Sequence, residues 1–314
     1  MSAPVDARWI GDDIGMIDLD FRGVPRVIAA YVLRTGDSIA LVECGATRSL
    51  PYLDAGLAAL GVADLPLTNL LVTHIHLDHA GAAGVLQQRH ADLQLWVHQI
   101  GAKHMVDPSG LLRSATRIYG DMMDTLWGEI VPCPEERTHA VDDEQVVDLG
   151  DRTLTAYYTP GHASHHIAWL DSRSGSLFTG DVAGVRIPPA SLTLPPTPPP
   201  DIDISAWRSS IARMQAIQPA RLLLTHFGPF DDVARHLTSL DAALSEIVAL
   251  IDDAQQAGQD RDALISTLRA HVQRLVADDH VPDTERQFAL TTPYGMAVDG
   301  LLRYLRKRDE GVLA

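Results

Sequence analysis

The stretch LLVTHIHLDHAGAAG, residues 70–84, places three histidines and an aspartate within six positions, directly after an apolar run. In an extended backbone alternate side chains share one face, so we expect His74, His76 and Asp78 to project together. His79 then opens a segment of small residues that lets a helix pack close to the end of the strand. Four ligand-type side chains are therefore predicted to converge where a strand becomes a helix.

Three further ligand-type residues follow apolar strands later in the chain. His162 stands in YYTPGHASHH, Asp181 in SLFTGDV and His226 in LLLTHFG. The carboxyl ends of strands are where α/β sheets gather their ligand sites. Neutral imidazole and carboxylate are ligands of zinc, iron or manganese, and no cysteine stands near these motifs. Chance would give HxHxDH in about 3 of 1,000 chains of this composition, so the pattern predicts a metal site.

The rest of the chain divides into two parts by its periodicity. Strand-like and helix-like runs alternate up to about residue 230, which predicts an α/β domain over residues 1–232. Within it, residues 101–128 are predicted to be helical, and the proline-rich residues 188–200 an extended surface connection. Three amphipathic segments follow from Val233, and they predict a helical C-terminal appendage over residues 233–314.

Composition excludes several classes of partner. The net charge is −16 and no basic run appears, so no nucleic-acid partner is expected. No stretch of 18 apolar residues and no signal-peptide pattern are present, so neither membrane insertion nor export is expected. Cys44 and Cys133 form no CxxC motif and are predicted to be thiols in a reducing cytoplasm. The oligomeric state stays open, a homodimer included.

The order HxHxDH, PGH, GD and LLLTH resembles that of the metallo-β-lactamase-fold metallohydrolases, over about residues 25–230. This resemblance implies an α/β fold, a four-layer αβ/βα sandwich with metals at one edge of the paired sheets. The segment PGHASHHI is similar to the PGHTxGHI segment of the glyoxalase II-like and lactonase-like branch, with His165 in place of glycine and Ala163 in place of threonine. The resemblance implies three groups of ligands: His74, His76 and His162 for a first ion, Asp78, His79 and His226 for a second, and Asp181 as the bridge.

A ligand set of this kind implies a dinuclear hydrolase that cleaves a small ester, thioester or lactone. Two divalent ions, zinc first and iron or manganese as alternatives, would lower the pKa of a shared water and polarise the substrate carbonyl. Asp78 is the candidate catalytic residue, because it could accept the proton of the attacking hydroxide. No GxSxG motif offers a serine nucleophile.

Two other functions remain open on the same scaffold. Persulfide dioxygenases resemble it but use one iron, held by residues that match His74, His162 and Asp181. A non-catalytic binding protein is the second alternative, although such a protein would be free to lose ligands. A nuclease fits the motif but not the charge, and the missing export signal speaks against a periplasmic β-lactamase.

Four residues near the motifs are ambiguous in sequence. His166 is predicted to support the ligands rather than to bind metal. Tyr157 and Tyr158 fit core packing, although one of them could donate to an oxyanion. Arg186 fits a solvated surface position, although it could reach an anionic group of the substrate.

Overall fold

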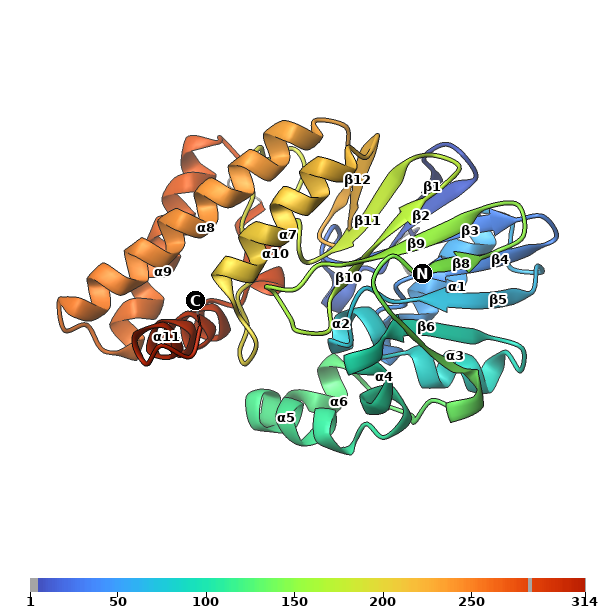
Figure 1. The fold of residues 1–314 in the computed structure, drawn as a ribbon, viewed down its shortest axis with the longest axis horizontal. Coiled ribbons are helices and arrows are strands. Elements are labelled where there is room, and N and C mark those ends of the chain that lie inside the picture. Colours follow the sequence, from blue (N-terminus) through green and yellow to red (C-terminus); the bar gives the residue numbers. More distant parts are fainter. Residues whose placement is uncertain (1–4, 282–283, 314) are drawn as a thin grey trace.

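Two β-sheets form the centre of the protein in the computed structural model, which describes residues 5–281 and 284–313. The first sheet has the order β1-β2-β3-β4-β5-β6-β7, and the second has the order β13-β12-β11-β10-β9-β8. Figure 1 shows the two sheets side by side, with helices on their outer sides. The strands of the first sheet are β1 (Ala7–Trp9), β2 (Ile14–Asp18), β3 (Ala29–Thr35), β4 (Ser38–Val42), β5 (Leu67–Leu71), β6 (Gln94–His98) and β7 (Thr138–Val141). Those of the second are β8 (Val146–Asp148), β9 (Thr153–Tyr158), β10 (Ile167–Asp171), β11 (Ser176–Gly180), β12 (Arg221–Leu224) and β13 (Gly228–Phe230).

Strand β3 shows why these residues form a central strand. Tyr31 and Leu33 belong to the hydrophobic cluster between the sheets. Ala30 and Val32 belong to the cluster under the helices of the first sheet. Successive side chains of a strand point to opposite faces, so an uninterrupted apolar run is buried on both sides.

Helices on the outer face of each sheet complete the four layers. On the first sheet, α1 packs through Leu50 and Leu53, and α3 through Leu86. On the second sheet, α7 packs through Trp207 and Met214. The predicted four-layer αβ/βα sandwich is therefore confirmed. These helices and their neighbours are α1 (Leu50–Ala59), α2 (Leu77–Ala80), α3 (Ala83–Arg89), α4 (Gln99–Val106), α5 (Ser109–Tyr119), α6 (Met123–Leu126) and α7 (Ile204–Ile217).

The chain ends in further helices, beyond α7 in Figure 1. These helices contribute Phe288, Val298 and Leu301 to the hydrophobic cluster that also fills the space between the sheets. The division at residue 232 therefore stays a prediction, because one core runs across it. No helix in the described ranges is long and apolar enough to cross a membrane. These helices are α8 (Val233–Gln256), α9 (Arg261–Asp278), α10 (Glu285–Thr291) and α11 (Tyr294–Asp309).

The structure corrects one expectation for the connecting segments and refines another. Residues 188–200 form an irregular connection without helix, with a turn at residues 188–189, and Thr193–Thr197 are buried rather than on the surface. Thr197 donates its hydroxyl to the carbonyl of Ala297 at 3.3 Å, so α11 covers this segment. Residues 101–128 are largely helical as predicted, but the helix is interrupted after α4, because a residue before proline avoids the helical region, as at Asp107. It breaks again at Gly120, which has a φ of 51°.

Candidate metal centre

The HxHxDH motif runs from the connection after β5 into α2. The strand ends at Leu71, and His76 still has extended backbone, with φ −62° and ψ 152°. Asp78 and His79 stand in the single turn of α2, so the expectation that Asp78 continues the extended stretch was wrong. All four side chains nevertheless converge, because the turn begins within the motif.

Three ends of the second sheet supply the other predicted ligands. His162 lies four residues beyond β9, Asp181 directly follows β11, and His226 follows β12. Gly180, just before Asp181, has a φ of 48°, and a Cβ there would lie 2.2 Å from the hydroxyl oxygen of Thr73. Only glycine lets the two sheets approach this closely beside the motif.

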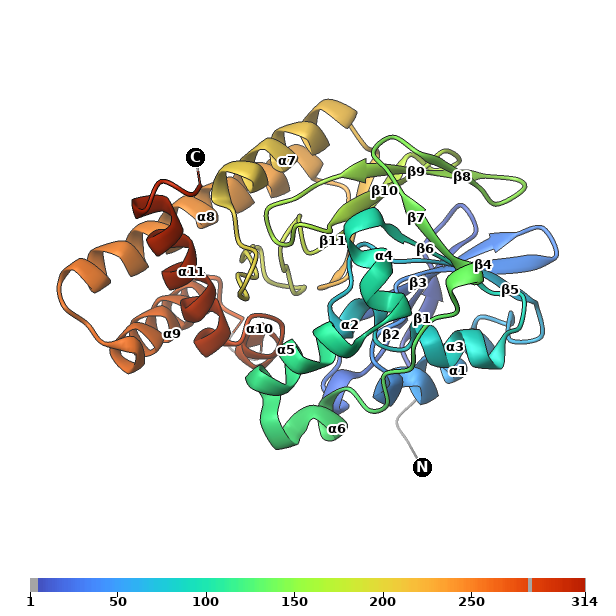
Figure 2. The same ribbon diagram turned by 60° about the horizontal axis from the view of Figure 1, so that its bottom comes forward.

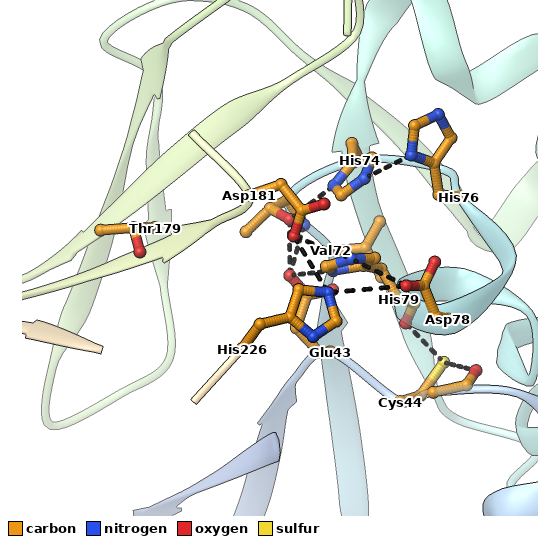
Figure 3. A network of polar contacts seen from close by, with 12 residues as sticks. Glu43, Cys44, Val72, His74, His76, Asp78, His79, Thr179, Asp181 and His226 are labelled. Carbon is orange, nitrogen blue, oxygen red and sulfur yellow. Dashed lines mark hydrogen bonds and ion pairs between the residues drawn. The ribbon is translucent and has the colours of Figure 1, made fainter. Parts of the chain in front are cut away.

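Asp181 is the side chain that links the two sets of imidazoles. Its Oδ2 lies 3.3 Å from Nε2 of His162. Its Oδ1 lies 3.2 Å from Nε2 of His79 and 3.2 Å from Nε2 of His226 (Figure 3). One carboxylate therefore faces two separate groups of ligand atoms.

The remaining contacts define those two groups. Nδ1 of His76 lies 2.9 Å from Nε2 of His74 and 3.1 Å from Nε2 of His162. Oδ2 of Asp78 lies 3.7 Å from Nε2 of His79 and 3.5 Å from Nε2 of His226. Within each group the ligand atoms lie within 4.8 Å of one another. The two groups are the two predicted sets, His74–His76–His162 and Asp78–His79–His226. A third group joins His74, His79 and Asp181.

Hydrogen bonds at the opposite ring nitrogens orient several of these imidazoles. Nδ1 of His162 donates to the carbonyl of Pro196 at 2.9 Å. Nδ1 of His226 donates to the carbonyl of Val27 at 2.5 Å. A ring that donates at Nδ1 keeps an unprotonated lone pair at Nε2, which is the form that binds metal.

Glu43 is a site residue that the sequence analysis missed. It is buried after the end of β4, and its Oε1 accepts from the Thr73 hydroxyl at 2.5 Å. The same oxygen lies 3.3 Å from Nδ1 of His79, while Thr73 Oγ1 lies 3.0 Å from Nδ1 of His74. An acidic residue directly after a buried strand, in LVECG, was the available signal. Glu43 thus orients one imidazole from each predicted set.

His166 holds Asp181 in place, in agreement with its predicted supporting role. Its Nε2 accepts from the backbone N–H of Asp181 at 3.2 Å. Its Nδ1 then donates to the hydroxyl of Thr159 at 2.9 Å. His166 is therefore not a ligand in this arrangement.

The other ambiguous residues lie away from the ligands. Tyr158 stacks on His98 with ring centroids 4.6 Å apart, and its hydroxyl donates to the carbonyl of Ser164. Tyr157 lies under the guanidinium of Arg213. Arg186 pairs with Asp232 at 2.8 Å. Each of these residues has a structural contact. Neither tyrosine lines the cavity that opens beside the ligands, and Arg186 does not line it either.

In the protein without metal, the buried carboxylates favour protonation of imidazoles that would otherwise bind ions. Burial lowers the pKa of His226, but Asp181 and Asp78 outweigh it and raise the pKa to about 9. Burial opposes ionisation of Asp78, yet His79 and His226 lower its pKa to about 2. Burial lowers the pKa of His76 to about 4. The carboxylates of Asp181 and Asp78 thus stabilise positive charge at His226, and bound cations would take the place of the protons.

The donor atoms fit divalent metal ions. Nε2 of His79, Nε2 of His226 and Oδ1 of Asp181 are buried and have no hydrogen-bond partner in the described parts of the chain. A buried polar atom without a partner is costly, and coordination would satisfy all three. The set of imidazoles and carboxylates, with no thiolate, suits zinc, iron or manganese.

A cavity of about 610 Å³ opens beside the cluster and is lined by Asp78, Asp181 and His226. Of the two candidate ligand carboxylates there, Asp78 is the more accessible, with its side chain 26% exposed against 6% for Asp181. Tyr119 of α5 also lines the cavity. Burial raises the pKa of the Tyr119 phenol, and Asp78 adds to the effect, so the phenol stays protonated. Nothing in the sequence around Tyr119 distinguishes it from a core tyrosine.

Comparison with known proteins agrees with this geometry. A metallo-β-lactamase fold-containing protein of Sulfurisphaera tokodaii is 27% identical over 210 residues, 65% of this chain and 74% of that protein. An atrochrysone carboxyl ACP thioesterase of Aspergillus fumigatus is 30% identical over 180 residues. That match covers 57% of this chain but only 45% of the thioesterase.

Solved structures share the fold. A crystal structure of a metallo-β-lactamase family protein from Thermus thermophilus gives a TM-score of 0.62 at 20% identity. The match covers 90% of this chain and 89% of that one. The family model of the metallo-β-lactamase superfamily matches residues 23–226, more than half of the chain. The protein therefore belongs to the metallo-β-lactamase superfamily.

Proposed function

We propose that the protein is a dinuclear metal-dependent hydrolase that cleaves a small ester, thioester or lactone. His74, His76 and His162 would hold one ion, Asp78, His79 and His226 the other, and Asp181 would bind both. The observation that carries the proposal is the position of Asp181, whose two oxygens lie 3.3 Å from His162 and 3.2 Å from His79 and His226. Zinc is the expected ion for this set of ligands.

The residues of the chain have distinct parts in this reaction. Two bound ions would lower the pKa of a shared water and polarise the substrate carbonyl. Asp78, ionised and open to the cavity, would accept the proton of that water. Tyr119, protonated and in the cavity wall, is the candidate donor to the carbonyl oxygen. The name of the Aspergillus relative, a thioesterase, supports carbonyl hydrolysis as the reaction class.

The rival reaction is persulfide oxidation at a single iron held by His74, His162 and Asp181. It would leave Asp78, His79 and His226 without a role, although their ligand atoms converge as closely as those of the first set. The second set therefore favours hydrolysis over the oxygenase.

An anaerobic assay separates the two reactions. Zinc-loaded protein is expected to cleave lactone or thioester substrates without oxygen, because hydrolysis involves no redox change. In parallel, iron-loaded protein is supplied with glutathione persulfide in an oxygen electrode. Oxygen uptake together with no anaerobic turnover would overturn the proposal in favour of the oxygenase.

A further inference from the structure

The cavity beside the cluster has the size of a binding site for a whole small molecule. Its volume is about 610 Å³. Ligand pockets in proteins are typically about 300–1,000 Å³. A lactone ring or an acetyl group would occupy only part of this space, so the walls have room for a longer substituent.

Much of the wall comes from three parts of the chain, α5, residues 196–200, and α10 with α11, and their side chains are mainly apolar. Helix α5 contributes Leu111 and Ile118, and residues 196–200 contribute four prolines. On the other side, α10 and α11 contribute Leu290 and Met296. Figure 2 shows α5 and α10 next to each other at this end of the molecule. Burial of a hydrocarbon chain against an apolar surface of this extent would be favourable.

Two large apolar side chains stand at the edge of the cavity. Ile100 of α4 is 39% exposed and Ile118 of α5 is 41% exposed, and both line the cavity. Exposed aliphatic side chains at the entrance extend the apolar wall outward from the metal cluster.

Charge in the lining is mostly negative. Arg22 is the only arginine among the described residues that line the cavity, and no lysine lines it. Asp78, Asp181 and Asp201 are the carboxylates there. Two divalent ions would bring four positive charges, of which Asp78 and Asp181 offset two, so the lining does not repel an anionic group once the ions are bound. The repulsion of an anionic leaving group comes instead at long range from the net charge of −16, of which the two ions would offset four.

We propose that the substrate carries a medium-length or longer apolar acyl group, bound in this cavity, on an uncharged alcohol or thiol leaving group. This inference rests on the proposed hydrolase function. The hydroxyl of water joins the acyl carbon, the carbon–oxygen or carbon–sulfur bond breaks, and the leaving group takes the remaining proton. The products are a carboxylic acid and a neutral alcohol or thiol.

The first test compares acyl length and leaving-group charge in one series. Zinc-loaded protein is assayed with acetyl, butyryl and octanoyl thioesters of N-acetylcysteamine, which is uncharged, and of coenzyme A, which is multiply anionic. From butyryl to octanoyl, kcat/KM is expected to rise at least about tenfold, because each buried methylene favours binding. For one acyl group, the coenzyme A thioester is expected to react about tenfold more slowly, and added salt should narrow this gap.

A matched pair of variants tests the position of the acyl group. Ser114 lies on α5 and lines the cavity, whereas Thr116 is exposed on the same helix and does not. Ser114→Phe is expected to lower the ratio of octanoyl to acetyl kcat/KM at least about tenfold, because the ring fills space needed by the chain. Thr116→Phe, with the same ring outside the cavity, should leave the ratio unchanged. Ala289→Phe fills the cavity from α10 and provides a second variant if Ser114→Phe does not fold.

The outcomes separate this inference from the hydrolase proposal. Turnover with no dependence on acyl length, or coenzyme A thioesters that react as fast as the neutral ones, would overturn the inference alone. If neither the thioesters nor matched esters and lactones are turned over, the hydrolase proposal fails, and calorimetry with octanamide and acetamide decides the binding question. Octanamide binding that Ser114→Phe weakens would support the apolar acyl site, and no octanamide binding would overturn it.

Discussion

Asp181 is the residue on which the dinuclear arrangement depends, because its two oxygens face different sets of imidazoles. Asp181→Ala is expected to lower zinc content from about two ions per chain and to reduce kcat/KM at least about a hundredfold. Metal analysis by mass spectrometry after gel filtration gives the first quantity. Asp201→Asn is the control, since Asp201 lines the cavity outside both sets. Full activity of wild type with a single bound ion would contradict the dinuclear account.

Glu43 orients His79 directly and His74 through Thr73. Glu43→Gln keeps the size of the side chain but removes the charge that fixes both contacts. We expect zinc affinity to fall about 10- to 100-fold with the fold retained. Competition with a chromophoric chelator measures the affinity, and circular dichroism checks the fold. Glu144→Gln, at an exposed position, is the control; an equal loss in both variants would show that Glu43 has no orienting role.

His226 makes metal binding sensitive to pH. Its pKa is raised to about 9 in the protein without metal, so below pH 9 a proton must leave before Nε2 can bind an ion. Burial lowers the pKa of His79 too, but Asp181 and Asp78 raise it well above its usual range, so this ring must also lose a proton. Apparent zinc affinity is therefore expected to rise at least about tenfold per pH unit from pH 7 to pH 9. Asp78→Asn removes a charge that raises this pKa and should flatten the dependence. An affinity that does not change between pH 7 and pH 9 would contradict the expectation.

The side chains that the sequence groups as ligands lie together in the structure, but the sequence did not reveal Glu43 and Tyr119 beside them. His74, His162 and the rest of the motifs stand at strand ends, where local pattern alone indicates a shared edge. Glu43 and Tyr119 reach the site only through the tertiary fold, since one contacts a residue 36 positions later and the other comes from a separate helix. No local pattern encodes such contacts.

At the scale of elements, α11 packs closely against residues 196–200 of the cavity wall because Gly300 has no side chain. A Cβ on Gly300 would lie 2.0 Å from the carbonyl oxygen of Thr197. Gly300→Ala is therefore expected to destabilise the protein by about 1–3 kcal/mol and to alter the acyl-length profile, because the helix or the wall must move.

Gly295 in the same helix is the matched control. A Cβ there would meet only side-chain atoms, the end of Arg261 at 3.3 Å and Cδ1 of Ile265 at 3.7 Å. Gly295→Ala should be neutral or stabilising by up to about 1 kcal/mol, because alanine favours the helix. Urea unfolding of both variants measures the difference. Equal free energies of unfolding in the two variants would show that the close contact between Gly300 and Thr197 does not limit the stability of the protein.

Long elements were easier to predict than short ones. The apolar periodicity of α8 extends over 24 residues and identifies the helix from sequence. Strand β7 has four residues, lies at the edge of the first sheet and was not predicted. Helix α10, with seven residues, was also missed. Such short segments owe their conformation to the partner beside them, which sequence does not display.

At the scale of the whole molecule, the ligand cluster joins both sheets. His74 and His79 follow β5 of the first sheet, whereas Asp181 follows β11 of the second. Bound ions should therefore stabilise the complete fold, by about 2.7 kcal/mol at a free zinc concentration 100 times the Kd. The melting temperature should rise with buffered zinc and fall on chelation. Asp181→Ala should reduce this dependence. A melting temperature that does not change with zinc would contradict the expectation that bound ions connect the two sheets.

The separation between ligands and cavity walls has a consequence for how this chain can evolve. The predicted ligands stand at sheet ends and on α2, whereas about half of the wall residues belong to α5, residues 196–200, α10 and α11. Substitutions in the walls can change substrate range across generations while the reaction chemistry is inherited intact. One tie limits this freedom, because the carbonyl of Pro196 holds His162. Around that residue side chains can diversify, but the path of the backbone must be conserved.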